Sequence, residues 1–244
     1  MLLTYKTGSD GWTEPQQWSE SMRFHPRLTI KAATYGGIDP LFDVKAAPNG
    51  PHNVGVRSGR WGYRHVTLPA WQCLVTYCGA KKGLVRFDGD VVIPTLYRDR
   101  VTSVWMSHTP MEVFSQRSGI EWASGTVLVG GFGMGWALRR IAEKASVERV
   151  ICVEKSGELI EWFGRRVCDS MSKVELVHGD VYEHIGKHGS DVKHVLDIWE
   201  GYRESMGDFR LMQAIADAPK SKLWCWGGTP SAIPTMLRKQ AACV

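Results

Sequence analysis

The sequence predicts an α/β protein: a Rossmann-like, doubly wound and mostly parallel sheet, preceded by a small antiparallel, β-rich N-terminal region. Three observations predict it. From residue 127 onward, short apolar runs alternate with helical patterns, which is typical of parallel strands joined by crossover helices. The first of these runs ends in a glycine-rich turn, and the runs between residues 65 and 97 have no helical pattern between them. We therefore expect an N-terminal region over residues 1–108 and a Rossmann-like domain over residues 109–244.

The glycine-rich turn lies between an apolar run and a helix. Residues Val127–Gly135 read Val-Leu-Val-Gly-Gly-Phe-Gly-Met-Gly, and a helical pattern follows at Trp136. Strand, glycine turn and helix open a nucleotide-binding βαβ unit, because glycines let the backbone approach a ligand and the helix N-terminus presents unpaired N–H groups. The spacing Gly131, Gly133, Gly135 lacks the third glycine of a dinucleotide fingerprint, and no Gly-Lys-Ser/Thr of a Walker loop is present.

Turn signals dominate residues 1–60, where only residues 28–32 indicate a strand. Four short apolar or alternating runs then predict the antiparallel sheet: residues 66–68, 71–77, 83–87 and 91–93. The pair Asp88-Gly89 lies between the last two runs and is a strong hairpin signal. Residues Arg57–His65 interleave basic and aromatic side chains; we interpret them as a solvated loop leading into a strand, with a nucleic-acid contact as the alternative.

A helix is predicted from Pro110 to about Ala123. Thr109 can cap it, Pro110 suits its first position, and Glu112 can close a capping box. The regular alternation then follows, with five strands predicted at residues 127–129, 149–153, 174–178, 194–196 and 222–226. Helices are predicted at residues 134–145, from Ser156 onward, at 181–187, at 209–218 and from residue 229 onward.

Three carboxylates stand where predicted strands end: Glu154, Asp180 and Asp197. In parallel α/β sheets, ligands bind outside the carboxyl ends of the strands, so these residues should meet the glycine turn. Glu154 lies 19 residues after Gly135, where a carboxylate can accept hydrogen bonds from both ribose hydroxyls; a merely exposed strand-end carboxylate is the alternative. For Asp180, the alternative to ligand contact is a helix N-cap.

The fourth predicted strand leads into Asp197-Ile-Trp-Glu200. Asp197 and Glu200 could hold or deprotonate a cationic amine, and they are our candidate catalytic residues. Trp199 and Tyr202 could wall the acceptor or contact a cation through their rings. A solvated loop with one core aromatic side chain is the alternative interpretation of this segment.

The Gly131-x-Gly133-x-Gly135 loop resembles the first motif of the class I S-adenosylmethionine-dependent methyltransferases. The resemblance to this family covers roughly residues 100–227. Val104–Met111 followed by this loop is similar to guanidinoacetate methyltransferase and its arginine-methylating relatives. The order of a small β-region before the core is similar to spermidine synthase. The resemblance implies S-adenosylmethionine as the cofactor. It implies these cofactor-binding residues: Trp105, Met111, Gly131, Phe132, Gly133, Gly135, Glu154, Lys155, Asp180 (on the adenine amino group), Val181 and Asp197.

The chain departs from the resemblance in two places. Val129 stands in the first strand where most of these methyltransferases carry an acidic residue, although spermidine synthases are apolar there too. Only 18 residues follow the fifth predicted strand, so a sixth and seventh strand do not fit. We expect the missing edge of the sheet to be covered by residues 1–110 or by a second subunit. In the second case the protein is a homodimer.

The net charge of +5 lies wholly in residues 1–110, which carry 13 Lys and Arg against 8 Asp and Glu. This excess is modest for a nucleic-acid-binding domain, so a nucleic-acid partner is the less favoured alternative. No signal core is present and no apolar run approaches the ~20 residues of a membrane span. The six cysteines form no Cys-x-x-Cys, so we expect no metal site, small buried side chains at Cys152 and Cys225, and a cytoplasmic protein.

These observations favour an S-adenosylmethionine-dependent methyltransferase that acts on a small amine or guanidine acceptor. A spermidine synthase-like aminopropyltransferase is the second hypothesis, and binding of decarboxylated S-adenosylmethionine distinguishes it. A non-catalytic binding protein that kept the fold is the third.

Overall fold

A computed structural model describes residues 6–7, 13–14, 27–35, 56–72, 74–78, 81–99, 104–201 and 204–228 of the chain. The chain forms two compact units, each discontinuous in sequence. The first comprises Met1–Val56, Tyr63–Thr95 and Ser107–Ser115, and the second comprises Arg57–Gly62, Leu96–Met106 and Gln116–Val244. The division after residue 108 stays a prediction.

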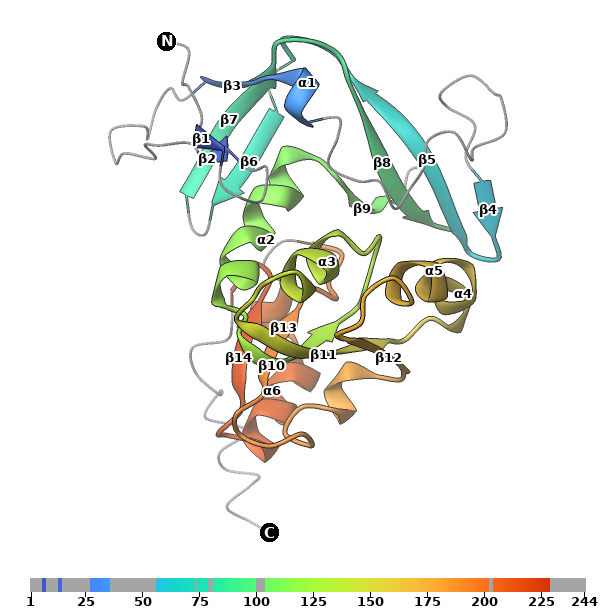
Figure 1. Cartoon of the computed structure of the whole chain (residues 1–244), viewed down its shortest axis with the longest axis vertical. Helices are drawn as coiled ribbons and strands as arrows, with labels where there is room; N and C mark the ends of the chain where they lie inside the picture. Colours follow the sequence, from blue (N-terminus) through green and yellow to red (C-terminus); the bar gives the residue numbers. More distant parts are fainter. Residues whose placement is uncertain are drawn as a thin grey trace. The chain divides into compact units, whose positions relative to one another are not determined.

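Five parallel strands form the sheet of the second unit, in the order β12-β11-β10-β13-β14 (Figure 1). Their bounds are Gly125–Gly130 for β10, Val147–Glu154 for β11, Val174–His178 for β12, Lys193–Leu196 for β13 and Lys222–Cys225 for β14. The order reverses between β10 and β13, which is the switch point where ligands bind in open α/β sheets. The predicted α/β fold class and all five predicted parallel strands are confirmed.

Burial on both faces explains why the strand β10 reads as a continuous apolar run. Val127, Leu128 and Val129 are all buried, although alternate residues point to opposite faces. A strand covered on both sides needs apolar side chains throughout, and β-branched residues suit an extended backbone. This is the reason the sequence pattern located the sheet accurately.

Helices cover both faces of the sheet. α3 (Trp136–Ala142) joins β10 to β11, and a longer connection of α4 (Gly157–Leu159), a π-helical turn η3 (Ile160–Gly164) and α5 (Arg165–Cys168) joins β11 to β12. The short 3₁₀ turn η4 (Val181–Glu183), a second such turn η5 (Glu204–Gly207) and α6 (Phe209–Asp217) belong to the later connections. Because right-handed crossovers running in opposite directions lie on opposite faces, α3 to α5 cover one face and η4 and α6 the other.

Two predicted helices are shorter than expected. The helix predicted over residues 134–145 begins only at Trp136, because Gly135 has a left-handed backbone with a φ of 83°. The helix predicted over residues 181–187 is the single turn η4, and Gly186 with a φ of 83° follows it. The capping of the second predicted helix by Ser156 is confirmed, since its Oγ accepts a hydrogen bond from the Leu159 N–H at 3.2 Å. The helix predicted from residue 229 lies outside the described residues.

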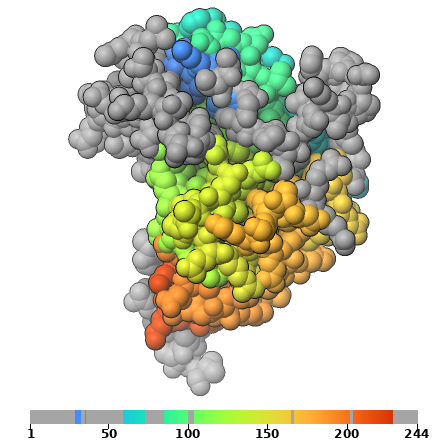
Figure 2. Space-filling view, in the orientation of Figure 1, coloured from blue at the N-terminus to red at the C-terminus, as the bar shows by residue number. Residues whose placement is uncertain are grey.

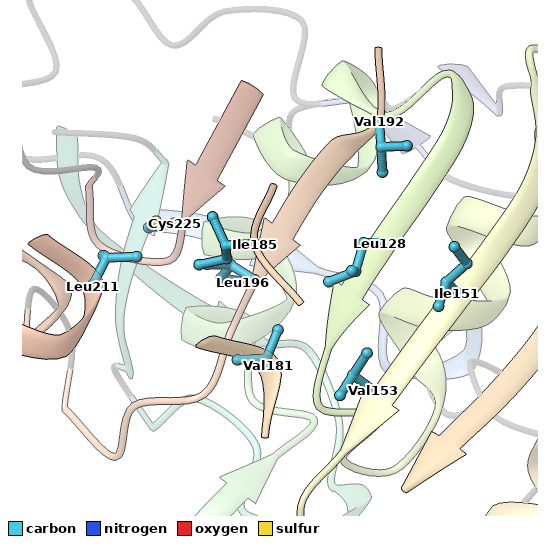
Figure 3. Close-up of a cluster of buried hydrophobic side chains, with 9 residues drawn as sticks. All are labelled: Leu128, Ile151, Val153, Val181, Ile185, Val192, Leu196, Leu211 and Cys225. Atoms are coloured by element: carbon cyan, nitrogen blue, oxygen red, sulfur yellow. The ribbon is translucent and has the colours of Figure 1, made fainter. Parts of the chain in front are cut away.

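The core on the α6 side of the sheet is a cluster of nine buried side chains (Figure 3). Its members are Leu128, Ile151, Val153, Val181, Ile185, Val192, Leu196, Leu211 and Cys225. The close-up draws Val181, Ile185 and Leu196 near the middle of this cluster, with Leu211 on one side and Leu128 on the other. Space filling shows the yellow and orange segments of this unit packed without a break on the face in view (Figure 2). This packed unit carries the ends of the strands that form the candidate site.

The first unit contains a three-stranded sheet in the order β3-β7-β6. β3 (Arg27–Ile30) is parallel to β7 (Lys81–Phe87), and β6 (Leu74–Cys78) is antiparallel to β7. Its core contains Ile30, Tyr35, Val85, Phe87 and Phe114 among other buried side chains. A four-stranded sheet has the order β4-β5-β8-β9, with bounds Val56–Ser58, Trp61–Leu68, Val91–Arg98 and Val104–Ser107. The remaining elements are the pair β1 (Lys6–Thr7) and β2 (Thr13–Glu14) and the short helix α1 (Ala32–Tyr35).

The predicted hairpin at Asp88-Gly89 is wrong. The strands on either side of this pair, β7 and β8, belong to different sheets. Asp88 instead accepts a hydrogen bond from the N–H of Ala32 at 2.7 Å, and its own N–H donates to Ile30. Asp88 and Gly89 are residues that favour a turn, but the contacts of Asp88 to β3 and α1 accompany a chain path in which β7 and β8 do not pair.

Residues Arg57–His65 are not the predicted solvated loop. Most of them lie in β4 and β5, which are joined by a tight turn at Gly59 and Arg60, and Trp61, Tyr63 and His65 are buried. The predicted helix is α2 (Pro110–Trp122), and Glu112 in its first turn accepts a hydrogen bond from the N–H of Ser107 in β9. The predicted capping box with Thr109 stays a prediction.

Cys152 and Cys225 are buried, as predicted, and neither is bonded to another cysteine. Among the described residues, no helix has the length and apolar character needed to cross a membrane. Within the same ranges, no three His, Cys, Asp or Glu side chains gather as they do around a metal ion.

Candidate functional site

Gly131 lies between the ends of two strands of the sheet. A Cβ atom at this position would lie 3.4 Å from the carbonyl oxygen of Asp197 and 3.9 Å from Glu154 Oε2. The backbone of Gly131 has a φ of 76°, which a glycine adopts without strain, and its N–H donates to Val153 at 2.8 Å. The sequence prediction that Glu154 and Asp197 meet at the glycine turn therefore agrees with the positions of these residues.

The Glu154 carboxylate is tied to the glycine loop. Its Oε2 accepts the N–H of Phe132 at 3.3 Å, and its Oε1 accepts the N–H of Ser156 at 2.8 Å. The residue is only 8% exposed, and burial raises its pKa, while the hydrogen bonds from these backbone N–H groups lower it in part. Each carboxylate oxygen can accept a second hydrogen bond, so the group can still bind two hydroxyls of a ligand.

Met106 of β9 covers the next glycine of the loop. Its sulfur accepts a hydrogen bond from the N–H of Met134 at 3.0 Å, and a Cβ atom at Gly133 would overlap that sulfur. The approach to Gly133 is therefore filled by a side chain of the same unit. A Cβ atom at Gly131 would instead lie at ordinary contact distance, 3.4 Å or more, from its neighbours.

Asp197 pairs with a buried amide. Gln116, on the part of α2 that belongs to the second unit, is 5% exposed and donates its Nε2 hydrogen to Asp197 Oδ2. Burial raises the pKa of Asp197 to about 7, although the Gln116 hydrogen bond lowers it somewhat. A carboxyl group with a pKa near neutrality can accept and release a proton at ordinary pH, as a general base must.

Asp180 is an N-cap and also an ion-pair partner. Its Oδ1 accepts the N–H of Tyr182 at 3.2 Å, which caps η4. Its Oδ2 accepts from Lys155 at 3.1 Å and from Arg210 at 2.9 Å. Burial alone would raise the pKa of Asp180, but these two cations lower it below its ordinary value. The adenine contact implied by the resemblance stays a prediction, and it would have to use a remaining lone pair of Oδ1.

Glu200 is exposed and pairs with Arg98 of β8. Arg98 Nη2 lies 3.6 Å from Glu200 Oε2, and the same guanidinium lies over the Trp105 ring, 4.2 Å from its centroid. Trp61 packs edge-on against Trp105, with ring centroids 5.6 Å apart. The predicted cofactor residue Trp105 and the predicted catalytic residue Glu200 are thus joined through Arg98.

Asp208 connects three elements beneath the strand ends. It accepts hydrogen bonds from the Tyr182 hydroxyl and from Trp199 Nε1, the latter at 2.7 Å, and it caps α6 through the N–H of Leu211 at 3.1 Å. Burial raises the pKa of Asp208, but the two side-chain hydrogen bonds reverse the effect and lower it. Trp199, predicted as an acceptor wall, is therefore fixed by its indole N–H. Tyr202 lies outside the described residues.

The remaining predicted residues have mixed positions. Phe132 is buried and contributes its N–H to Glu154, while Val181 is part of the core cluster beneath the sheet. Gly135 ends the loop at the first turn of α3. Met111 belongs to the first unit, so its contact with a cofactor stays a prediction.

Sequence reasoning missed Gln116, Met106, Arg98 and Asp208. Each is a single polar or sulfur-containing residue in an element whose pattern is otherwise structural, and none has a fixed spacing to a motif. For Asp208, the available signal was its place directly before an apolar helical run, which is typical of an N-cap. For Gln116, the signal was an amide on the apolar side of α2, where side chains are buried.

Several solved structures are similar to the chain at low identity. They include spermidine synthase in complex with the transition state analogue AdoDATO, at 17% identity and a TM-score of 0.39, and spermidine synthase from Thermotoga maritima, at 16% and 0.38. Each match covers 64% of this chain and 62% of the other, so the match spans less than two thirds of those proteins. The Trypanosoma brucei PRMT1 enzyme–prozyme heterotetrameric complex with AdoHcy matches at 18% and 0.34, over 51% of this chain and 38% of the other. No protein-family model and no curated protein sequence matches the chain.

Proposed function

We propose that the second unit binds S-adenosylmethionine and transfers its methyl group to the nitrogen of a small amine. The observation that carries the proposal is the place of Gly131, where an added Cβ atom would lie within 4 Å of both the Asp197 carbonyl oxygen and the Glu154 carboxylate at the switch point of the sheet. A glycine there lets a ligand reach the two strand ends at once. Few other residue types could stand between them.

The residues present fit the nucleoside half of this cofactor. The two oxygens of Glu154 have about four acceptor positions, of which the backbone N–H groups of Phe132, Ser156 and Lys155 use some, and the buried setting makes a hydrogen bond to a ribose hydroxyl strong. Lys155 follows β11 directly after Glu154, and its ion-pair partner Asp180 comes after the neighbouring strand β12, where the two can contact the base. When bound, S-adenosylmethionine supplies a methyl group on a positively charged sulfur, so no metal ion is needed for the transfer.

The chain's own part in the reaction falls to Asp197. Methyl transfer to an amine needs the nitrogen in its unprotonated form and needs an acceptor for the proton that the product releases. Asp197 has the pKa for that task, about 7, and it lies at the switch point. Glu200, with Arg98 beside it, is further out and can attract the acceptor by its charge.

Calorimetry with the full chain tests the proposal. We expect binding of S-adenosylmethionine and of its demethylated product, no binding of NADH, and weaker binding of decarboxylated S-adenosylmethionine. Glu154→Ala should reduce the affinity at least tenfold because two charge-assisted hydrogen bonds are lost. Glu161→Ala, which removes an exposed carboxylate from η3, is the matched control. Tight binding of NADH, or equal affinity of the wild type and Glu154→Ala, would reject the proposal, and a preference for the decarboxylated form would favour aminopropyl transfer.

A further inference from the structure

We propose that Gln116 is a second acceptor-binding residue, which together with Asp197 selects a primary amine and limits the reaction to one methyl group. This inference rests on the proposed function and deepens it. It assigns a role to a residue that no sequence motif indicates, and it names the substrate class by the number of N–H groups that the site can accept.

The buried amide of Gln116 has an acceptor that nothing in the described chain uses. Its Nε2 donates to Asp197 Oδ2, but its Oε1 is fully buried and accepts no hydrogen bond from any residue in the described ranges. A buried carbonyl oxygen is costly to leave unpaired, so the great majority of such atoms in folded proteins have a partner. The missing partner must be a donor that is not part of the described chain.

The Asp197 carboxylate supplies a second acceptor beside the first. Gln116 uses one of its oxygens, and in the described ranges Oδ1 accepts no hydrogen bond. The amide oxygen of Gln116 is attached to the same carbon as the nitrogen that contacts Asp197, so the two acceptors are neighbours. A ligand with two donors on one atom can bridge them.

A neutral primary amine has two N–H groups and one lone pair. With one N–H on Gln116 Oε1 and the other on Asp197 Oδ1, the lone pair is left to attack the methyl carbon. A carbon–nitrogen bond forms, the carbon–sulfur bond breaks, and the sulfur keeps that electron pair as an uncharged thioether. The nitrogen is then a secondary ammonium with two N–H groups, and Asp197 takes one of these protons.

The released secondary amine has one N–H group. It satisfies only one of the two acceptors, and the other is left buried and unpaired as in the empty site. Because each 1.4 kcal/mol corresponds to a factor of ten, we expect binding to be weaker by about tenfold with one N–H lost and by more with two. The site should therefore discriminate primary from methylated amines and release a singly methylated product.

The test uses amines that differ only in methylation: butylamine, N-methylbutylamine and N,N-dimethylbutylamine, with the same three forms of benzylamine. Each is titrated by calorimetry into the full chain loaded with S-adenosylhomocysteine. Gln116→Met removes both the donor and the acceptor of the side-chain amide at nearly constant shape, and Gln116→Glu keeps an acceptor oxygen there. Gln213→Met, on the exposed side of α6, is the matched control. Thermal unfolding confirms that each variant is folded, and mass spectrometry counts the methyl groups of the products.

We expect the wild type and Gln213→Met to bind the primary amine at least tenfold more tightly than the dimethylated one. In Gln116→Met this ratio should fall to within threefold of unity, whereas Gln116→Glu should retain most of it. An unchanged ratio in Gln116→Met, or no preference in the wild type, would overturn the inference and leave a buried water as the donor. If Gln116→Met does not fold, loss of the ratio in folded Gln116→Glu overturns it, and retention supports it. Failure of the wild type to bind S-adenosylhomocysteine would instead reject the proposed function.

Discussion

The sulfur of Met106 occupies the space in which a side chain at Gly133 would begin. It accepts the Met134 N–H at 3.0 Å, and Met106 Cε would lie 3.0 Å from a Cβ atom at Gly133. Gly133 is therefore needed for two separate reasons: its left-handed φ of 53° and its close contact with β9. A second glycine of the same unit, Gly125, has a φ of 64° but no atom within 4 Å of a Cβ. Comparing substitutions at Gly125 and Gly133 therefore separates the cost of backbone strain, which both share, from the cost of steric overlap, which only Gly133 has.

We predict that Gly133→Ala destabilises the chain more than Gly125→Ala. The second change should cost about 1–2 kcal/mol, which is the strain of an alanine in the left-handed region. The first should cost a further amount of about 1 kcal/mol, because the flexible Met106 side chain must move and lose its hydrogen bond from the Met134 N–H. Urea unfolding measures both.

The Met106→Ala background is the control for that comparison. There the overlap is gone, so Gly133→Ala should cost no more than Gly125→Ala does in the same background. If the excess cost persists without the Met106 side chain, the contact between Met106 and Gly133 does not explain it.

A stability gain at neutral pH is expected for Asp197→Asn, together with loss of activity. Burial raises the folded-state pKa of Asp197 to about 7, whereas the unfolded value is about 3.9. Between these values the folded chain holds a proton that the unfolded chain has released, so wild-type stability falls as the pH rises from about 4 to 7 and then levels. An asparagine does not titrate, so the variant should exceed the wild type by on the order of 2–4 kcal/mol at pH 8, and by much less near pH 4.

Urea unfolding across pH 4–8 gives this difference directly. Asp191→Asn is a suitable control, because Asp191 is almost fully exposed and should change stability by no more than about 0.5 kcal/mol at either pH. A difference between Asp197→Asn and the wild type that is the same at pH 4 and pH 8 would show that Asp197 does not titrate in this window.

The parallel sheet was predictable because its strands are buried on both faces. Strands such as β10 and β11 must be apolar through several successive residues, and that requirement is visible in the sequence. The partner of a strand is not visible in this way. Asp88-Gly89 has the chemistry of a hairpin turn, yet β7 and β8 pair elsewhere because contacts of Asp88 to α1 and β3 decide the path.

The candidate site was predictable only where topology places it. Strand ends in a parallel sheet gather at one edge, so the convergence of Glu154 and Asp197 on Gly131 follows from the order of elements alone. Gln116 and Arg98 belong to segments of this unit that lie outside the regular alternation, and their partners are distant in sequence. Such long-range pairs depend on the packing of whole elements, which no local pattern records.

Removal of Arg98 should strengthen the attraction of a cationic acceptor to Glu200. The Arg98 guanidinium lies 3.6 Å from the Glu200 carboxylate and neutralises it. In Arg98→Met the apolar contact with Trp105 is largely kept, but the charge is lost. We expect the KM for a cationic amine to fall about two- to fivefold at low salt, and this gain to disappear at 0.5 M salt because exposed charges are screened.

Glu200→Gln decides what that effect means. If Glu200 attracts the acceptor, Arg98→Met in the Glu200→Gln background should leave KM unchanged. A fall in KM of the same size in both backgrounds would assign it to Arg98 alone, and an unchanged KM in Arg98→Met would remove Glu200 from the acceptor site.

Asp208 should be an acid-sensitive group of the second unit. Its pKa is lowered because the Tyr182 hydroxyl and the Trp199 indole N–H stabilise the charged form more than burial disfavours it. A carboxylate with a depressed folded-state pKa contributes stability above its unfolded pKa of about 3.9, and this contribution is lost as the pH falls through the folded value. We therefore predict that Asp208→Asn lowers the free energy of unfolding by about 1–3 kcal/mol at pH 7. The single amide oxygen of asparagine cannot accept from the two side-chain donors and cap α6 at the same time. The difference from the wild type should shrink below about pH 4, which acid titration of urea unfolding measures.

Asp217→Asn, at the exposed end of the same helix, should lose less than about 0.5 kcal/mol at either pH. The near-ultraviolet circular dichroism spectrum should change only for Asp208→Asn, because that variant alters the hydrogen bond of the Trp199 indole. An equal loss of stability in both variants would mean that the Tyr182 and Trp199 hydrogen bonds add no more to the free energy of unfolding than an ordinary surface charge does.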